Sequence, residues 1–305
     1  MLLHVPFVKV ILENTYERVI FMSNNIGDRI PKKIHYCWFG GKHIPDNLQR
    51  CIDSWKRLEG YEIIRWDESN CSFDENEFVK KAYAEKKLGF IGDYYRLKAI
   101  YEHGGIYLDT DVEVFNDFEP LLSDTVFFGF NYDCCIGTGI IGSVQGAPYI
   151  KKLMDLYDNT VFGETTNGKQ FQLTEDDKVI LTGFETSNYY HTVYVLKYYK
   201  DLQFNNTYQD MGDFRVYPKE YFEIGMMNKK QYTIHYNTGS WMNPDDKSGS
   251  GIKSFIKKIL AKNPYIWYKA QIIARRNLYY RLNKTIPFYP QYVAQKKGLE
   301  VPPVD

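Results

Sequence analysis

The chain has 305 residues, of which 44% are apolar and 25% charged, and its formal net charge is zero; these are ordinary values for a soluble globular protein with one large α/β domain or two smaller ones. Its five cysteines are odd in number and show no CxxC spacing, so the sequence predicts neither a disulfide framework nor a zinc site. A protein of the reducing cytosol is the expectation. No run of eighteen apolar residues predicts a membrane span, and the apolar start of the chain lacks the cleavage site of a secretory signal.

The zero net charge hides an uneven distribution. Residues 247–305 contain twelve Lys or Arg and two acids, so the rest of the chain holds 26 basic and 36 acidic residues. The break falls in a stretch rich in turn residues, 243–251. We expect an N-terminal extension over residues 1–28, a principal domain over 29–246 and a basic amphipathic helical tail over 247–305.

The first predicted elements are a strand, a helix and a second strand. Lys33–Phe39 is an apolar run bounded by two glycines, and apolar residues then recur at helical spacing from Leu48 to Trp55. Tyr61–Trp66 is the next apolar run. A strand, a crossover helix and a strand form a βαβ unit, which predicts a parallel sheet with a nucleotide-sized crevice at its carboxyl edge.

Two further helices and a strand follow. Helical patterns cover residues 75–88 and 91–102, and the second pattern stops at His103-Gly104-Gly105, where a glycine can adopt a left-handed cap. Ile106–Leu108 then begins a strand that runs directly into Asp109-Thr110-Asp111.

Asp109 and Asp111 stand at the end of this predicted strand, separated by one residue. Two carboxylates in this arrangement converge on the crevice and can bind a hard cation, because carboxylate, phosphate and water oxygens suit Mg²⁺ or Mn²⁺. Such a cation bridges the phosphates of a nucleotide-activated sugar and neutralises the charge on the departing diphosphate. A bare DxD is most often a pair of surface acids. The apolar strand and the glycine pair before this one favour the functional interpretation.

Asp93 and Arg96 lie at positions i and i+3 of the preceding helix, on one face. One interpretation is an intrahelical ion pair, which contributes about 0.2–0.5 kcal/mol. In the other, Asp93 accepts hydrogen bonds from sugar hydroxyls while Arg96 donates its planar fork to hydroxyl or phosphate oxygens. Position in the sequence leaves both open.

Three segments together resemble the family 32 glycosyltransferases, whose sugar-binding region contains a DxD motif: IHYCWFGG (34–41), FIGDYYRLKAIYEHGGIYLDTDVEV (90–114) and YTIHYNTGSW (232–241). The catalytic cores of the large clostridial glucosylating toxins are similar. Order and spacing match over residues 30–245. The resemblance implies a GT-A fold, which is an α/β fold with a Rossmann-like mixed sheet flanked by helices, and a retaining transferase.

Carried over position by position, the resemblance implies that Trp38 stacks on the nucleotide base, that Asp93 and Arg96 hold the donor sugar, and that Ser240 and Trp241 close over the diphosphate. Asp109 contacts ribose and metal, and Asp111 coordinates the metal directly. The implied donor-binding set is Trp38, Asp93, Arg96, Gly105, Tyr107, Asp109, Ser240 and Trp241; the catalytic set is Asp109, Asp111 and Arg96; the metal set is Asp109, Asp111 and His235.

Some of these positions have structural alternatives. Trp38 in an apolar strand can be a core residue, and His235 between Ile234 and Tyr236 can be a satisfied structural histidine. The chain also departs from its relatives, which commonly read Asn-Thr-Gly on the strand after DxD, whereas this sequence has Gly137-Thr138-Gly139.

The resemblance predicts a retaining, metal-dependent glycosyltransferase that uses Mn²⁺ or Mg²⁺ and moves a sugar from a nucleotide sugar, with UDP-hexose favoured, to a glycan or lipid-linked acceptor in surface polysaccharide synthesis. No nucleic-acid partner is expected. A sugar-phosphate phosphatase that uses the DxD is one alternative, although the motif of such enzymes has Thr or Val two residues after the second Asp, where this chain has Glu113. A non-catalytic carbohydrate- or membrane-binding protein is the other.

The composition of the basic tail, residues 247–305, indicates where in the cell the protein lies. Between residues 252 and 262 apolar side chains share one helical face and lysines surround it, and a second helix after Pro264 carries Trp, Tyr and Arg residues. This composition is typical of a helix that lies on an anionic lipid surface. We therefore expect a cytoplasmic protein at the inner face of the plasma membrane. A helical hairpin packed on the core is the alternative.

Overall fold

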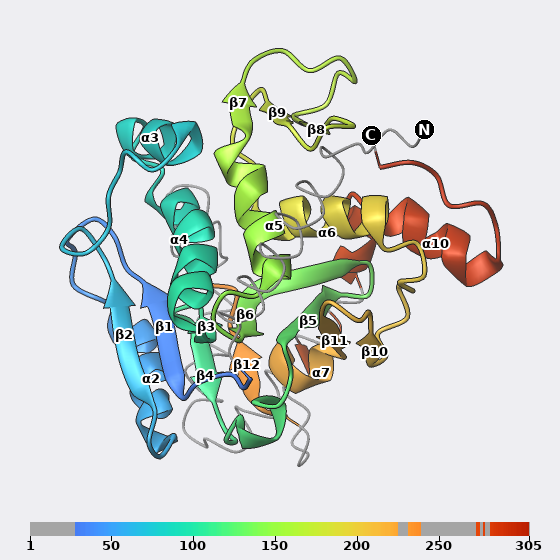
Figure 1. Ribbon diagram of the computed structural model, residues 1–305. Coiled ribbons are helices and arrows are strands. Elements are labelled where there is room, and N and C mark those ends of the chain that lie inside the picture. The colour runs from blue at the N-terminus through green and yellow to red at the C-terminus, as the bar shows by residue number, and fades with distance from the viewer. Residues whose placement is uncertain (1–27, 225–230, 239–272, 275–276, 278–280, 305) are drawn as a thin grey trace, which may run out of the picture.

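The structure, a computed structural model, describes residues 28–224, 231–238, 273–274, 277 and 281–304 (Figure 1). The N-terminal extension through residue 27 and most of residues 239–280 lie outside this part of the chain. Ser240, Trp241 and the lysine-rich start of the tail therefore lie outside the described residues, and their predicted roles stay predictions.

A seven-stranded mixed sheet forms the centre of the domain, with the strand order β10-β11-β5-β6-β3-β1-β2 (Figure 1). β2, β1 and β3 run parallel, whereas β6 is antiparallel to both β3 and β5. The strands are β1 (Lys33–Cys37), β2 (Glu62–Trp66), β3 (Gly105–Leu108), β5 (Val126–Tyr132), β6 (Cys135–Ser143), β10 (Gln209–Asp210) and β11 (Arg215–Tyr217). The predicted βαβ unit and α/β mixed sheet are confirmed.

Helices cover both faces of this sheet. On β1, Tyr36 contacts Trp55 just after α2 (Asp46–Ser54), while the neighbouring Cys37 faces Gly92 of α4 (Leu88–His103) on the opposite face. The same alternation occurs on β5, where Phe128 contacts α6 (Ser187–Tyr198) and Gly129 lies against α7 (Lys219–Phe222). This alternation is the period-two pattern of a strand that is buried on both sides.

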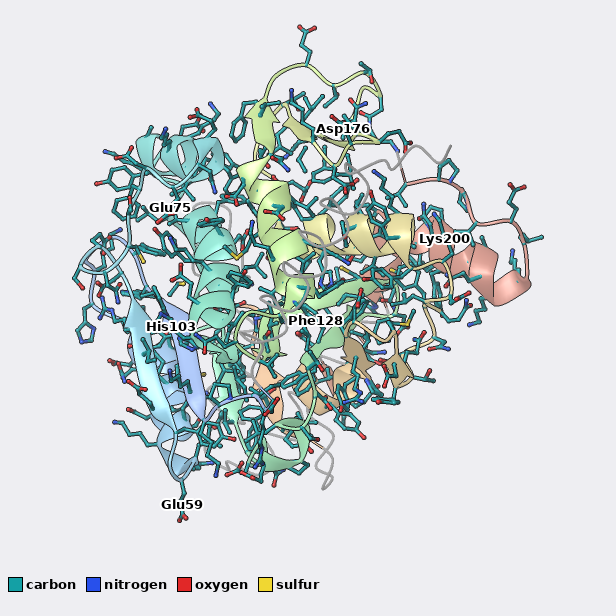
Figure 2. All side chains as sticks on the ribbon, viewed as in Figure 1. Glu59, Glu75, His103, Phe128, Asp176 and Lys200 are labelled. Atoms are coloured by element: carbon teal, nitrogen blue, oxygen red, sulfur yellow. The ribbon has the colours of Figure 1, made fainter. Side chains whose placement is uncertain are left out.

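Side chains fill the space between the sheet and the helices (Figure 2). Phe128 is fully buried near the centre of the molecule, whereas Glu59 and Asp176 lie exposed at its periphery (Figure 2). The remaining elements are η1 (Trp55–Arg57), α3 (Glu77–Ala84), η2 (Glu119–Leu121), α5 (Pro148–Asp158), β7 (Thr160–Phe162), β8 (Phe171–Leu173) and β9 (Val179–Leu181). Among the helices that the structure describes, none combines the length and the apolar character that a membrane span requires.

A second, two-stranded sheet joins β4 (Val112–Val114) to β12 (Thr233–His235) in antiparallel register. His235 pairs with Val112 and thereby comes next to the DxD segment, although more than a hundred residues separate them in the sequence. The backbone of β4 is held from its other side, since the indole N–H of Trp55 donates to the Val112 carbonyl at 2.8 Å.

The C-terminal segment packs on the domain through η4 (Asn283–Thr285) and α10 (Tyr289–Lys297). The Asn283 amide donates to Asp133 at 2.6 Å, and Phe288 is buried against Tyr189. The end of the predicted tail is therefore part of the folded domain, while the boundary near residue 247 stays a prediction.

The turn between α4 and β3 sets the position of the DxD segment. Gly104 and Gly105 have φ angles of 61° and 115°, and a Cβ on Gly105 would lie 2.8 Å from the Lys33 carbonyl oxygen, so both positions require glycine. Beneath the turn, His35 Nε2 donates to the Gly104 carbonyl at 2.8 Å, and its Nδ1 accepts from the Trp66 indole at 3.1 Å. Burial lowers the pKa of His35 to about 4, so the imidazole is neutral in the folded protein.

We expect the free energy of unfolding to fall as the pH is lowered from about 6.5 to 4, partly because of His35. In this window the unfolded chain binds a proton at His35 that the folded protein does not, so stability rises with pH. The full shift corresponds to about 3 kcal/mol. Urea unfolding as a function of pH measures this effect, and a His35→Asn variant, which has no titrating ring, should show a shallower slope. Equal slopes for the two proteins would contradict the assignment.

Candidate metal and donor-sugar site

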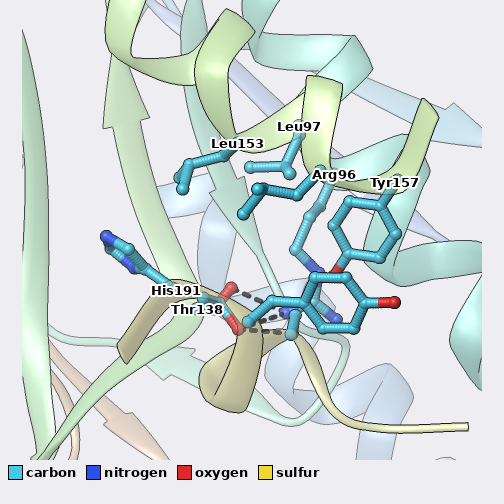
Figure 3. Close-up of a pocket in the computed structure, with 9 residues that line it drawn as sticks. Arg96, Leu97, Thr138, Leu153, Tyr157 and His191 are labelled. Atoms are coloured by element: carbon cyan, nitrogen blue, oxygen red, sulfur yellow. Dashed lines mark hydrogen bonds between the residues drawn. The ribbon is translucent and has the colours of Figure 1, made fainter. Parts of the chain in front are cut away.

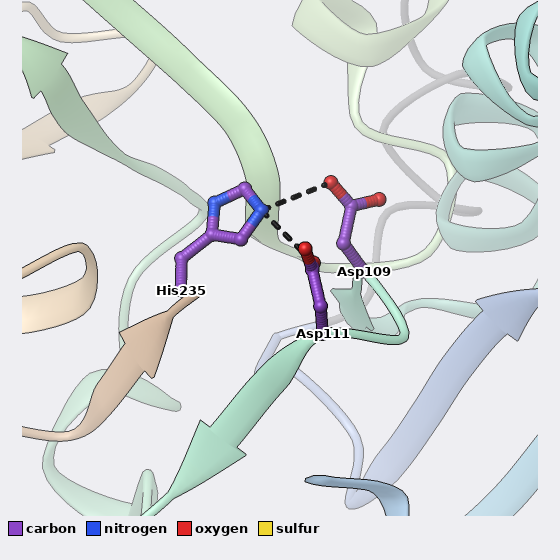
Figure 4. A group of neighbouring side chains, drawn as sticks. All are labelled: Asp109, Asp111 and His235. Atoms are coloured by element: carbon purple, nitrogen blue, oxygen red, sulfur yellow. Dashed lines mark ion pairs between the residues drawn. The ribbon is translucent and has the colours of Figure 1, made fainter. Parts of the chain in front are cut away.

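The DxD segment and His235 converge at one point beside the main sheet (Figure 4). Asp109 directly follows β3, Asp111 directly precedes β4, and His235 ends β12. His235 Nε2 lies 3.1 Å from Asp111 Oδ1 and 3.7 Å from Asp109 Oδ2, and one ligand atom from each of the three residues lies within 4.8 Å of the others. Two carboxylates and an imidazole at this spacing are a fitting ligand set for a divalent cation.

The protein holds the second oxygen of each aspartate. The Tyr107 hydroxyl donates to Asp109 Oδ1 at 3.0 Å, which leaves Oδ2 turned toward His235. The backbone N–H and the hydroxyl of Thr238 donate to Asp111 Oδ2 at 2.7 and 3.0 Å, which leaves Oδ1 turned toward His235. Each carboxylate is thus oriented with one oxygen bound by the protein and the other directed at the common point.

His235 is held in the same manner. Its Nδ1 lies 3.0 Å from Oε2 of Glu223, which directly follows α7, while its Nε2 faces the two aspartates. Burial opposes a charge on this imidazole, but the carboxylates of Glu223 and Asp111 raise the pKa of His235 well above its usual value. For Asp111, burial raises the pKa, but the ion pair with His235 and the Thr238 hydrogen bonds bring it below the usual value.

Arg96 connects Asp109 to Asp93. Its guanidinium lies 2.7 Å from Asp93 Oδ1 and 3.4 Å from Asp109 Oδ1, and it donates to the Thr138 carbonyl at 2.7 Å. The ring of Tyr107 lies under the same guanidinium, at 4.9 Å. The predicted intrahelical ion pair with Asp93 therefore exists, but it is buried, and Arg96 also reaches Asp109 after β3 and Thr138 on β6.

Burial dominates the ionisation of both aspartates beside Arg96. Desolvation raises the pKa of Asp93 to about 6, although Arg96 and hydrogen bonds from Ser187 partly offset it. Desolvation also raises the pKa of Asp109, again against the opposing charge of Arg96. Arg96 is thus the cation that partly offsets the cost of a charge on buried Asp93 and on partly buried Asp109.

A small cavity lies behind Arg96 (Figure 3). Its volume is about 10 Å³, which is roughly the space of one water molecule and far too small for a sugar. The lining includes two buried polar atoms without a hydrogen-bond partner among the described residues, the Tyr157 hydroxyl and His191 Nδ1. The cavity belongs to the packing that supports Arg96.

The structure brings Asp93, Arg96, Tyr107, Asp109, Asp111 and His235 together, as the contacts above show. Trp38 directly follows β1, is partly buried, and donates its indole N–H to the Lys42 carbonyl at 2.7 Å. Gly105 lies at the opposite end of β3 from Asp109, against Lys33 and His35. Its predicted donor contact is untested, and its local role is to permit the turn.

Besides Thr238, three residues that contact the site were not singled out in the sequence. Glu223 contacts His235, Thr138 accepts from Arg96, and Ser187 donates to Asp93. Glu223 belongs to no motif. Thr138 lies in the recognised Gly-Thr-Gly segment, but nothing in the sequence indicated that it faces α4.

The structure thus places three candidate ligands for a divalent cation beside a buried Asp–Arg pair, at the carboxyl end of a parallel strand, which is where α/β proteins bind nucleotides. Residues 45–128 match the family described as "glycosyltransferase sugar-binding region containing DXD motif". This match includes Asp93, Arg96, Asp109 and Asp111, whereas Trp38 and His235 lie outside it.

A known relative agrees with this family. The chain is 29% identical over 110 residues to inositol phosphoceramide mannosyltransferase 1 of Schizosaccharomyces pombe, which is 33% of this chain and 34% of that protein. The chain thus matches about a third of the length of this curated relative. Together with the family match, this similarity confirms the predicted resemblance to DXD glycosyltransferases and supports the prediction of a transferase.

Two solved structures share a more distant likeness. The PaToxG glycosyltransferase is 19% identical, with a TM-score of 0.36 over 48% of this chain and 68% of that one. A glycosyltransferase involved in the glycosylation of the major capsid of PBCV-1 is 13% identical, with a TM-score of 0.38 over 68% of this chain and 95% of that one. Neither likeness bears on the chemistry of the site.

We expect Arg96→Lys to lower the free energy of unfolding by about 3 kcal/mol, because one ammonium cannot replace a guanidinium fork that serves Asp93, Asp109 and Thr138 at once. Arg65→Lys is the matched control. Arg65 pairs with Asp67 at 2.8 Å on the exposed edge strand, where the pair contributes about 0–1 kcal/mol. Urea unfolding compares the two variants, and similar losses would show that Arg96 has no special structural role.

Proposed function

We propose that this chain is a retaining, metal-dependent glycosyltransferase that moves a sugar from a nucleotide sugar, with UDP-hexose as the favoured donor, to a glycan or lipid-linked acceptor. The observation that carries the proposal is the convergence of Asp109, Asp111 and His235 beside the Asp93–Arg96 pair. The family match over residues 45–128 supports sugar transfer as the chemistry.

The ligand set favours Mn²⁺ over Mg²⁺. Mg²⁺ prefers oxygen ligands in near-ideal octahedral geometry, whereas an imidazole nitrogen is better suited to a first-row transition metal. When bound, the cation supplies charge neutralisation for the departing nucleoside diphosphate. Asp109 and Asp111 present the Oδ atoms for it, and Tyr107 and Thr238 keep these atoms in place.

Other residues of the site bind the donor. Asp93 accepts hydrogen bonds from donor hydroxyls, and Arg96 holds Asp93 and Asp109 at a fixed separation. Trp38 offers a ring face to the base. For retention we favour attack from the leaving-group face, in which the bond from the anomeric carbon to phosphate oxygen breaks, the bond to the acceptor oxygen forms, and the acceptor proton passes to the departing phosphate oxygen.

The two alternatives make different demands on the site. A sugar-phosphate phosphatase would release inorganic phosphate from a sugar phosphate with no acceptor present. A non-catalytic carbohydrate- or membrane-binding protein would bind its ligand without turnover. The presence of Asp93, Arg96, Asp109 and Asp111 together in one site argues for the transferase.

Replacing Asp111 tests the metal site. Asp111→Ala should abolish sugar transfer and Mn²⁺-dependent binding of UDP, because it removes a ligand atom and the partner of Thr238. Asp53→Ala is the control, since Asp53 is an exposed acid on α2 outside the site. A donor panel with Mn²⁺ measures transfer, and calorimetry measures binding. If Asp111→Ala retains more than a few per cent of the activity, Asp111 is not an essential metal ligand.

We further propose that the basic segment after residue 247 docks the protein on an anionic membrane, which would serve a lipid-linked acceptor in surface polysaccharide synthesis at the cytoplasmic face. The segment's lysines, its aromatic residues and its amphipathic pattern support this proposal. Deletion of the whole tail is a poor test, because residues 283–304 pack on the domain.

The sharper test changes charge alone. Lys257→Gln with Lys258→Gln should weaken co-sedimentation with anionic vesicles by more than tenfold at low salt, since each charge near such a surface contributes about 1 kcal/mol. Lys80→Gln with Lys152→Gln removes the same charge from the surface of the folded domain and should have little effect. If both pairs reduce binding equally, net charge and not this segment governs the interaction.

A further inference from the structure

Glu223 is a buried carboxylate behind His235, with only 1% of its surface exposed. It directly follows the short helix α7, where its backbone N–H donates to the Lys219 carbonyl at 2.7 Å. Its two carboxylate oxygens lie 3.0 and 3.2 Å from His235 Nδ1. The other ring nitrogen, Nε2, faces Asp109 and Asp111.

We infer that Glu223 is a positioning residue of the cation site: it accepts a hydrogen bond from Nδ1–H of His235 and so keeps Nε2 directed at the cation. This inference rests on the proposed function. In a neutral imidazole one nitrogen carries the hydrogen and the other carries the lone pair. An acceptor at Nδ1 therefore selects the tautomer whose Nε2 can bind a metal, and its negative charge makes Nε2 a better ligand.

The neighbouring strand is shaped to admit this pair. A Cβ on Gly137 would lie 3.1 Å from Glu223 Oε1, and a Cβ on Gly139 would lie 2.6 Å from His235 Cε1. Two glycines on one face of β6 thus leave the space that Glu223 and His235 occupy. A side chain at Gly137 would therefore press on the Glu223 carboxylate.

The backbone fixes the pair as well. The His235 N–H donates to the Glu223 carbonyl at 3.3 Å, so the two residues are joined through main chain and side chain alike. The Asn237 amide contacts the same carboxylate, at 3.4 Å from Oε2. Because the backbone of Glu223 is fixed by these hydrogen bonds and by α7, its carboxylate is well placed to fix the orientation of the His235 ring.

A purely structural role for Glu223 would affect stability alone, whereas a positioning role acts on the cation through His235. The experiment measures the Mn²⁺ affinity of the full chain by isothermal titration. Glu223→Gln keeps the volume and a neutral oxygen acceptor, while Glu223→Met keeps the volume but offers only a thioether sulfur, a much weaker acceptor. Glu220→Gln is the matched control, because Glu220 lies on the same helix and bonds to Asn206 at 2.8 Å, away from His235.

We expect Glu223→Gln to weaken Mn²⁺ binding about tenfold and Glu223→Met about a hundredfold, in the range usual for partners of metal-bound histidines. Glu220→Gln should match the wild type within about twofold. In a His235→Ala background, Glu223→Gln should have no further effect, since the residue through which it acts is gone. Gly137→Ala, which only crowds the carboxylate, should weaken binding a few-fold and serves if the Glu223 variants do not fold.

Two results would overturn the inference while leaving the proposed function intact. One is an unchanged Mn²⁺ affinity in Glu223→Gln and Gly137→Ala. The other is an equal loss from Glu223→Gln with and without His235. A wild-type chain that binds no Mn²⁺ would instead refute the metal site itself, and with it the proposed function.

Discussion

The site depends on one electrostatic constraint, which is the crowding of four carboxylates, three of them buried and Asp109 partly buried, into a small volume. Arg96 joins Asp93 to Asp109, and His235 joins Asp109 and Asp111 to Glu223, so acids and bases alternate from α4 to the end of α7. Buried charges are tolerated only when they are paired and hydrogen-bonded. Four acids against Arg96 and one histidine leave an excess of negative charge, and a divalent cation is the species that offsets such an excess.

The topology supplies each member of this series from a different element. α4 provides Asp93 and Arg96, the end of β3 provides Asp109, and the antiparallel pairing of β12 with β4 brings His235 beside Asp111. β6 contributes Gly137 and Gly139, which have no side chains and so leave space for Glu223 and His235. The site is thus a junction of the main sheet with the small second sheet, and neither sheet alone contains it.

Sequence patterns predicted the part of this arrangement that is local. The βαβ unit, the end of α4 at its glycine pair, and the position of Asp109 and Asp111 after a buried strand all follow from hydrophobic period and turn chemistry. The contact between His235 and Asp111 depends on strand pairing across 124 residues, and only the resemblance to a family suggested it. Glu223 was missed because a buried carboxylate has no periodic signature, and its partner is identified only once the sheet is assembled. Packing on the domain was the alternative interpretation of the tail, and the structure shows it for residues 283–304; an amphipathic pattern alone does not distinguish a lipid surface from a protein surface.

The alternating series has a consequence for how the two halves of the site communicate. Arg96 contacts both Asp93, which we propose holds the sugar, and Asp109, which we propose is a cation ligand. A change in the charge or position of one aspartate alters how strongly the Arg96 guanidinium interacts with the other. The free energies of hydrogen bonds that share one donor group in a poorly solvated site are not additive. Donor sugar and cation are therefore expected to bind as coupled ligands, and the coupling passes through a side chain that need not touch either of them.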